Sequence, residues 1–246
     1  MSTTSLVRTT AHLGVNRNLI LTRSVLSGIV GMVPVPYIDE LLAGAVRAQL
    51  IRKLAAIRQV DVDENAVHAL SEPAGSRVLG AAGIGALAVG AAQPKWRKVM
   101  GRVGTSLLVI RRVDEAAESF QVATLFDHYC ARMHVGAGLD GHSGLLVRHA
   151  IDLAAKSARS DLLRGAFSRG FDRISSLGRR LPKIAWSRLR GANVTAAAEP
   201  LANEAAELID KEVAVVEASY LSSLLTRFDV AWASVQAMKP PGAKKP

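Results

Sequence analysis

The sequence predicts an all-α protein, and three observations support this fold class. Ala, Leu, Val and Arg dominate the 246 residues, while aromatic residues make up only 4%; this mixture favours helix over sheet. Apolar residues recur at helical spacing along most of the chain. No stretch of useful length alternates between apolar and polar residues, and the sequence shows no internal repeat. We therefore expect a multi-helix bundle with two short apolar Gly/Ala-rich helices and a long C-terminal helix.

The N-terminal region is predicted to begin with a helix from about Ser5. This helix leads into a stretch without charged residues, 24–38, which contains Gly28 and is broken by Pro34 and Pro36. Arginines precede the stretch, as in a secretory signal, but no small-x-small cleavage site follows it. We expect the stretch to be retained as structure and the protein to be cytoplasmic.

The next helix is predicted over residues 37–59, with an apolar stripe and two acidic residues in its first turn, where the helix dipole favours negative charge. An acidic turn follows. Asp61 or Asp63 in this turn is expected to cap a short helix that ends near Leu70.

A second charge-free stretch, Val78 to Pro94, reads VLGAAGIGALAVGAAQP. It is as long as a short membrane span, but its Gly and Ala content makes it weakly hydrophobic. Its glycines would let another helix approach closely. We expect helices over 95–110 and 114–134 and a flexible Gly-rich loop over 135–143. A basic collar directly follows the stretch, formed by Lys95, Arg97, Lys98 and Arg102.

The C-terminal half is predicted to be helical and basic from Leu145 to Arg190. A linker over 191–200 and a last helix over 201–238 with an acidic start are expected to follow. The chain is thus divided into an apolar helical domain (1–140), a basic helical region (141–190), a C-terminal helix (191–238) and a disordered tail (239–246).

Residues Gly28 to Leu70 resemble a helical family found in inner-membrane proteins of enteric bacteria and at the C-terminal ends of some bacterial GTPases. The resemblance covers under a quarter of the chain, and nothing after about residue 100 has a counterpart in the family. It implies a membrane-associated helical domain and a possible GTPase partner. The chain itself has no P-loop motif. The features that carry the resemblance are Pro34, Pro36, Tyr37, Asp39, Gln49 and the turn Val60-Asp61-Val62-Asp63.

One short segment contains the residue types of a metal site. On a helix, Asp127, Cys130 and His134 would share one face, and all three are ligand types that zinc accepts. A single helix rarely surrounds a metal alone, so we favour the interpretation that these residues pack in the core, with Cys130 as a small buried side chain. Neither a catalytic motif nor a dinucleotide fingerprint is present. We therefore predict no enzyme activity and no cofactor.

The formal charge of +10 predicts an anionic partner. Between residues 148 and 190, arginines are interleaved with apolar residues at helical spacing. Such a helix can lie in a bilayer interface with its cations at the headgroups, or it can pack in a soluble bundle. The predicted membrane- or anion-binding residues are the basic collar (Lys95, Arg97, Lys98, Arg102) together with Arg164, Arg169, Arg173, Arg179, Arg180 and Lys183.

Three functional interpretations follow from this charge. The first is a non-enzymatic binding or scaffolding protein, peripheral to the inner membrane, whose partner is the anionic membrane surface or a membrane-linked protein. The second is sequence-independent nucleic-acid binding by residues 148–190, without support from a known nucleic-acid-binding motif. In the third, the chain is a soluble helical bundle with a protein partner, and its basic region docks on the acidic start of the last helix, Glu204 to Glu217.

Overall fold

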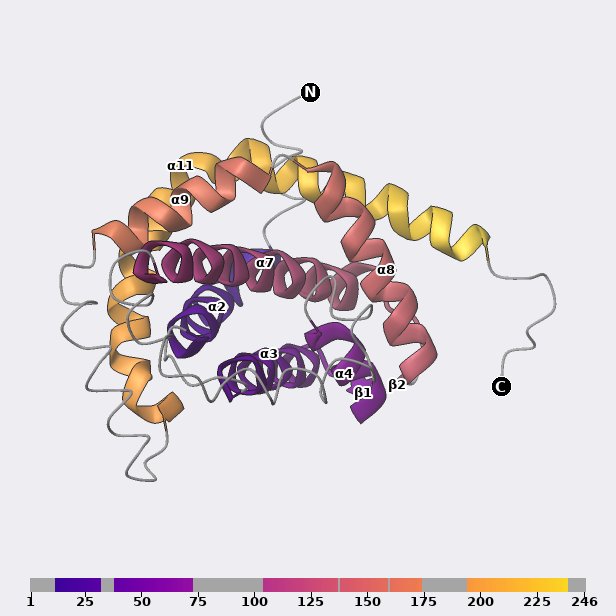
Figure 1. Ribbon diagram of the computed structural model, residues 1–246. Helices are drawn as coiled ribbons and strands as arrows, with labels where there is room; N and C mark the ends of the chain where they lie inside the picture. Colours follow the sequence, from indigo (N-terminus) through magenta and orange to yellow (C-terminus); the bar gives the residue numbers. More distant parts are fainter. Residues whose placement is uncertain are drawn as a thin grey trace.

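The computed structural model describes residues 12–31, 38–72, 104–136, 138–158, 160–173 and 194–238. Within these residues the chain forms the seven helices given below, a short helical segment at 12–14 and one pair of two-residue strands (Figure 1). The prediction of an all-α helical bundle is confirmed. The second charge-free stretch and the basic collar lie outside the described residues. The elements are α2 (Arg17–Gly31), α3 (Ile38–Ile57), β1 (Asp61–Val62), α4 (Glu64–Ser71), α7 (Gly104–Arg132), β2 (Gly138–Leu139), α8 (Gly141–Ser157), α9 (Ser160–Asp172) and α11 (Val194–Ala237).

Helix α7 runs through the middle of the bundle and packs against α2, α3, α8 and α9 (Figure 1). Its side chains from Ala116 to Tyr129 are almost all buried, including Phe120 and Phe126. One hydrophobic core therefore joins the N-terminal region, the basic region and the C-terminal helix. The predicted break between residues 110 and 114 is wrong, because no proline or glycine interrupts that charged segment and the helix continues through it.

The first charge-free stretch contributes to the core. Ser24, Val25, Leu26, Ser27, Ile29 and Val30 of α2 are all fully buried. A Cβ atom on Gly28 would lie only 2.9 Å from the carbonyl oxygen of Arg112 and 3.0 Å from the Cβ of Ala116. The described part of this stretch therefore brings α2 against the backbone of α7 and does not form an outer surface.

The chain leaves α3 through a left-handed residue, Gln59, with φ of 57°. The backbone N–H of Val60 donates to Ala55 O and that of Gln59 to Ala56 O, an arrangement that satisfies the last carbonyls of a helix. Asp63 then caps α4, as predicted, by accepting a hydrogen bond from the Ala66 N–H at 2.6 Å.

Two segments predicted as turn and loop contain the parallel strand pair β1–β2. Asp61 lies opposite Gly138, and Val62 lies opposite Leu139. The predicted loop over 135–143 is corrected accordingly, since β2 lies within it and α8 already begins at Gly141. Asp140 caps α8 by accepting from the Ser143 N–H. Two-residue strands carry no sequence periodicity, so their pairing was not predictable from composition.

Helix α11 begins at Val194, so the predicted linker over 191–200 is wrong from residue 194 onward. Pro200 lies inside the helix, where it removes one backbone hydrogen bond. Ala198, Leu201 and Ala202 around it are buried, and this packing holds the first turns in helical form. The helix then curves over α2, α9 and α8 (Figure 1).

Candidate functional site

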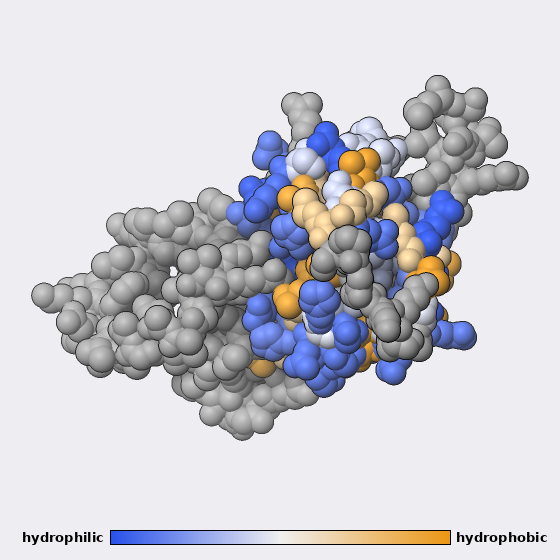
Figure 2. Space-filling view, turned by 90° about the vertical axis from the view of Figure 1, so that its right-hand side faces the viewer, coloured by the Kyte–Doolittle hydropathy of each residue, from blue (hydrophilic) through white to orange (hydrophobic). Residues whose placement is uncertain are grey.

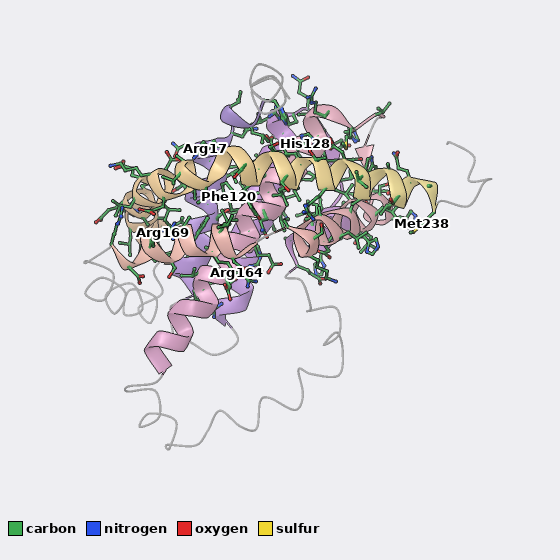
Figure 3. The ribbon with its side chains drawn as sticks, turned by 90° about the horizontal axis from the view of Figure 1, so that it is seen from above. Arg17, Phe120, His128, Arg164, Arg169 and Met238 are labelled. Carbon is green, nitrogen blue, oxygen red and sulfur yellow. The ribbon has the colours of Figure 1, made fainter. Side chains whose placement is uncertain are left out.

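Three of the predicted anion-binding arginines lie in the described structure, and each forms an ion pair with a carboxylate. Two of them, Arg164 and Arg169, are labelled in Figure 3. Arg169 and Arg173 both contact Glu212 of α11, at 2.7 and 2.5 Å, while Arg164 contacts Asp114 of α7 at 3.2 Å. The hydrogen bond from Arg169, followed by the nearby charge of Arg173, lowers the pKa of Glu212. Arg169 and Arg173 thus dock on the acidic part of the last helix, as the third interpretation predicted.

The opposite side of the acidic part of α11 is contacted by α2. Arg17 binds Asp210 at 2.8 Å, and Arg23 binds Glu199 at 3.0 Å. Carboxylates of α11 are therefore neutralised from two sides, by cations of α2 and of the α9 region (Figure 3). The remaining predicted anion-binding residues lie outside the described residues: Lys95, Arg97, Lys98, Arg102, Arg179, Arg180 and Lys183.

Charge is unevenly divided between the described helical body and the rest of the sequence. The described residues contain 16 Lys and Arg and 21 Asp and Glu, so this body is net acidic. The remaining residues contain 15 Lys and Arg and no Asp or Glu. Ten of these cations belong to segments 73–103 and 174–193. The whole positive excess of the chain is therefore carried by sequence outside the described helices.

Three of the helix ends that flank these segments lie at one end of the bundle. In Figure 1, α7 begins, α9 ends and α11 begins at the left of the molecule. The close approach of α2 Gly28 to Arg112 O and the Phe171 ring places α7 and α9 together there, and the Arg23–Glu199 ion pair places the start of α11 beside α2. The two helix ends that flank segment 174–193 therefore lie at this end of the bundle. The helix start that follows segment 73–103 lies there as well.

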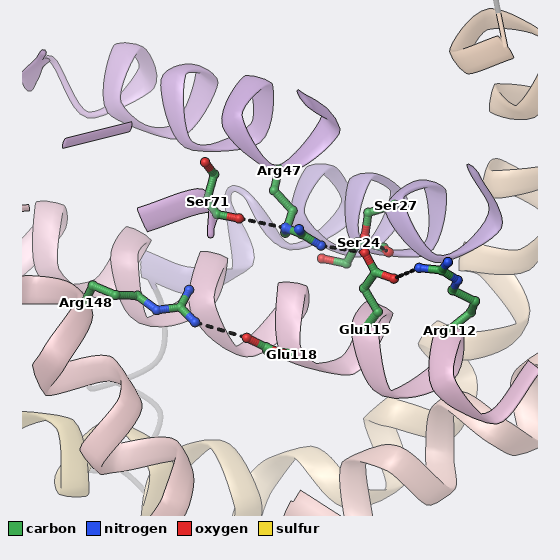
Figure 4. Close-up of polar contacts among 8 residues, drawn as sticks. All are labelled: Ser24, Ser27, Arg47, Ser71, Arg112, Glu115, Glu118 and Arg148. Carbon is green, nitrogen blue, oxygen red and sulfur yellow. Dashed lines mark hydrogen bonds and ion pairs between the residues drawn. The ribbon is translucent and has the colours of Figure 1, made fainter. Parts of the chain in front are cut away.

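The interior also holds buried cations that the sequence did not reveal (Figure 4). Arg112 is 1% exposed and binds Glu115, whose other oxygen is 2.6 Å from Arg47. Arg148, 2% exposed, binds Glu118 and Asp152. The guanidinium groups of Arg47 and Arg148 also donate to the carbonyls of Ser71 and Leu70. They satisfy carbonyls at the end of α4 that have no partner within the helix, which is a structural role.

The predicted metal-site residues do not converge on a common point. The Asp127 carboxylate is fully buried and accepts hydrogen bonds from Arg58 and from Asn16 at 2.7 Å. Burial raises the pKa of the Cys130 thiol to about 12, which disfavours the thiolate that binds metals. His134 Nδ1 lies 3.4 Å from the hydroxyl of Tyr129. Among the described residues, no three His, Cys, Asp or Glu side chains are grouped as metal ligands would be.

A second polar cluster lies beside Asp127 and joins three parts of the chain. His12 Nε2 is 3.0 Å from Nδ1 of His128 on α7, and His128 Nε2 is 2.9 Å from Oδ1 of Asp229 on α11. His128 is 2% exposed. Its partners are 116 and 101 residues away, a separation at which no local pattern signals contact.

In the view from the right of Figure 1, apolar and hydrophilic residues both contribute to the described surface (Figure 2). None of the helices in the described ranges combines the length and apolar character needed to cross a bilayer. The chain matches no protein-family model, no curated protein and no solved structure. The resemblance of residues 28–70 to a membrane-associated helical family therefore stays a prediction.

Proposed function

We propose that this protein is a non-enzymatic, peripheral membrane-associated binding or scaffolding protein that attaches to anionic lipid at the inner membrane. The observation that carries the proposal is the division of charge between an acidic helical body and purely basic segments. A protein with its cations spread evenly would have no preferred face toward an anionic surface. Here the positive excess belongs to sequence outside the described helices, and three of the four helix ends that flank its two largest segments lie at one end of the bundle.

The ion pairs within the body support this assignment. Arg164, Arg169 and Arg173 each have a carboxylate partner in the fold. A phosphate headgroup would have to compete with that partner for the guanidinium. The basic residues of segments 73–103 and 174–193 have no acidic residue within their own segments. We therefore assign the electrostatic attraction to anionic lipid to the basic residues of these two segments.

The acidic body contributes to orientation. An anionic bilayer attracts basic residues by about 1 kcal/mol each near its surface and repels carboxylates. A body with more carboxylates than cations is thus repelled by the membrane, while the basic segments are attracted to it. This orientation would leave the exposed faces of α8 and the C-terminal half of α11 free for a membrane-linked protein partner. The family resemblance suggests a GTPase in that role.

Vesicle flotation with charge variants tests the proposal. The full-length protein should float with vesicles that contain an anionic lipid and remain at the bottom with purely zwitterionic vesicles. Replacing Arg179, Arg180 and Lys183 with Gln should weaken binding by about 3 kcal/mol, or roughly 150-fold. The matched control, with Lys53, Lys156 and Lys211 changed to Gln, removes the same charge from exposed positions on the described helices. It should retain most of the binding.

Two outcomes would overturn the proposal. Equal loss of binding in both variants would mean that net charge, and not the position of the basic segments, governs attachment. Failure of the unmodified protein to float at low salt would exclude the anionic bilayer as its partner. A gel shift with duplex and single-stranded nucleic acid, run at the same low salt, would then test the second interpretation.

A further inference from the structure

We propose that the hydrogen-bonded chain His12–His128–Asp229 is a pH-sensitive tie that holds residues 12–16 on α7 and α11 at neutral pH and releases them in acid. This proposal does not depend on the proposed membrane function. It rests on the contacts of His12 and of its neighbours Leu13 and Asn16.

At neutral pH the chain of contacts needs only one proton on each ring. Asp229 accepts a hydrogen bond from Nε2–H of His128, which leaves Nδ1 of His128 as an acceptor. His12 Nε2–H can then donate to that nitrogen across 3.0 Å. Three further contacts hold the same residues: Arg58 donates to the carbonyl of His12, Asn16 donates to Asp127, and Leu13 is 7% exposed in the core.

A first added proton is compatible with the tie. With one extra proton on the pair of rings, one nitrogen of the 3.0 Å contact still donates and the other still accepts. A second proton is not compatible. With both rings charged, two N–H groups face each other across the 3.0 Å contact and neither nitrogen can accept.

The charges around the two rings make the second proton more unfavourable. Asp127 and Arg132 lie on α7, Arg58 follows α3, and Asp229 lies on α11. Their charges balance while both rings are neutral, so two imidazolium groups leave the cluster with an excess of two positive charges. Asp127 cannot offset them fully, since both of its oxygens are already bound by Arg58. The Phe228 ring packs edge-on against His128 and supplies no charge.

The direction of the pH effect follows from this environment. Burial, and then the charges of His128 and Arg132, lower the pKa of His12 from 6.5 to about 4 in the docked state. Once released, His12 returns to its ordinary pKa, so the released state binds more protons between these values. Docking is complete above about pH 6.5 and weakens as the pH falls toward 4. The shift would change the docking equilibrium by up to about 300-fold, reduced by the water that reaches the ring.

Deuterium exchange followed by mass spectrometry tests the tie, with a chelator present so that no metal ion can bridge the imidazoles. After correction for the intrinsic pH dependence of exchange, the peptide covering residues 12–22 should lose protection about 10- to 100-fold between about pH 7.5 and pH 5. The α8 peptide, 141–157, should keep its protection. His12→Gln, which cannot be charged, should abolish the pH response, whereas the control His142→Gln, at an exposed position on α8, should retain it.

A pH response in His12→Gln equal to that of the unmodified protein would overturn the proposal, as would an unmodified protein with no response. If residues 12–16 of the His12→Gln variant do not dock even at neutral pH, the variant cannot test the tie. Imidazole NMR of the unmodified protein then tests whether protonation of His12 accompanies the release. His12 should then take up its proton over the same pH range in which residues 12–22 lose protection. Titration of His12 near 6.5 without any loss of protection would contradict the tie.

Discussion

The carboxylate of Glu115, which binds two buried arginines, provides a quantitative test of the ion pairs inside the bundle. Its two oxygens face Arg47 and Arg112, whose side chains are 10% and 2% exposed, and its own side chain is 15% exposed (Figure 4). Glu115→Gln preserves the shape of the side chain but removes the negative charge that Arg47 and Arg112 both bind. Removing one partner of a buried ion pair typically costs about 3–5 kcal/mol. Because Gln can still accept one hydrogen bond, we expect a loss of about 3 kcal/mol.

Urea unfolding followed by far-UV circular dichroism gives the free energy of unfolding directly. For a chain of this size the expected loss also lowers Tm by roughly 6–12 °C. The matched control is Glu64→Gln, which breaks the ion pair with Arg52 at the surface, where Glu64 is 77% exposed. The unfolding midpoint of this control should not change measurably.

A double variant identifies the cause of the loss. Arg112→Met removes one of the two cations that bind Glu115, so the double variant should be less destabilised than the sum of the two single variants. If Glu115→Gln and Glu64→Gln lowered the free energy of unfolding equally, Glu115 would not lie between two buried cations as described.

Two further predictions concern helix packing and the thiol. Gly144→Ala should lower the free energy of unfolding by about 1–3 kcal/mol, because the added Cβ would lie 2.7 Å from Cα of Ala66. Gly44→Ala should raise the free energy of unfolding by about 0.5–1 kcal/mol, because no atom lies within 4 Å of the added Cβ. If the urea midpoints of the two variants shifted in the same direction, these two predictions would be wrong. Burial raises the pKa of Cys130 from 9.0 to about 12, so iodoacetamide should alkylate the native thiol roughly 1000-fold more slowly than the urea-unfolded one near pH 8. Equal rates would contradict the burial.

The sequence predicted those features of the fold that local chemistry determines. The apolar spacing between residues 38 and 57 and the acidic turn after it were enough to place α3 and α4 and to limit the cap of α4 to Asp61 or Asp63. The continuous helix through residues 110–114 and the helical start of α11 around Pro200 were missed. At Pro200 tertiary packing overrides a local signal, since Ala198 and Leu201 are buried around the proline.

The contacts of the candidate site were less accessible to sequence reasoning. The predicted docking of the basic region on α11 was right for Arg169 and Arg173, because complementary charge is visible in composition. The pairing of Arg47 with Glu115 joins residues 68 apart, and the contact of His12 with His128 joins residues 116 apart. Such contacts depend on how the helices cross, which no local periodicity specifies.

The salt dependence of vesicle binding by the unmodified full-length protein tests the central functional claim most directly. If basic segments attach an acidic helical body to lipid, binding to anionic vesicles should be strong at low salt and fall steeply as salt screens the charges. Binding to zwitterionic vesicles should be absent at every salt concentration. Binding that is the same for both kinds of vesicle, or that persists unchanged at high salt, would contradict electrostatic attachment.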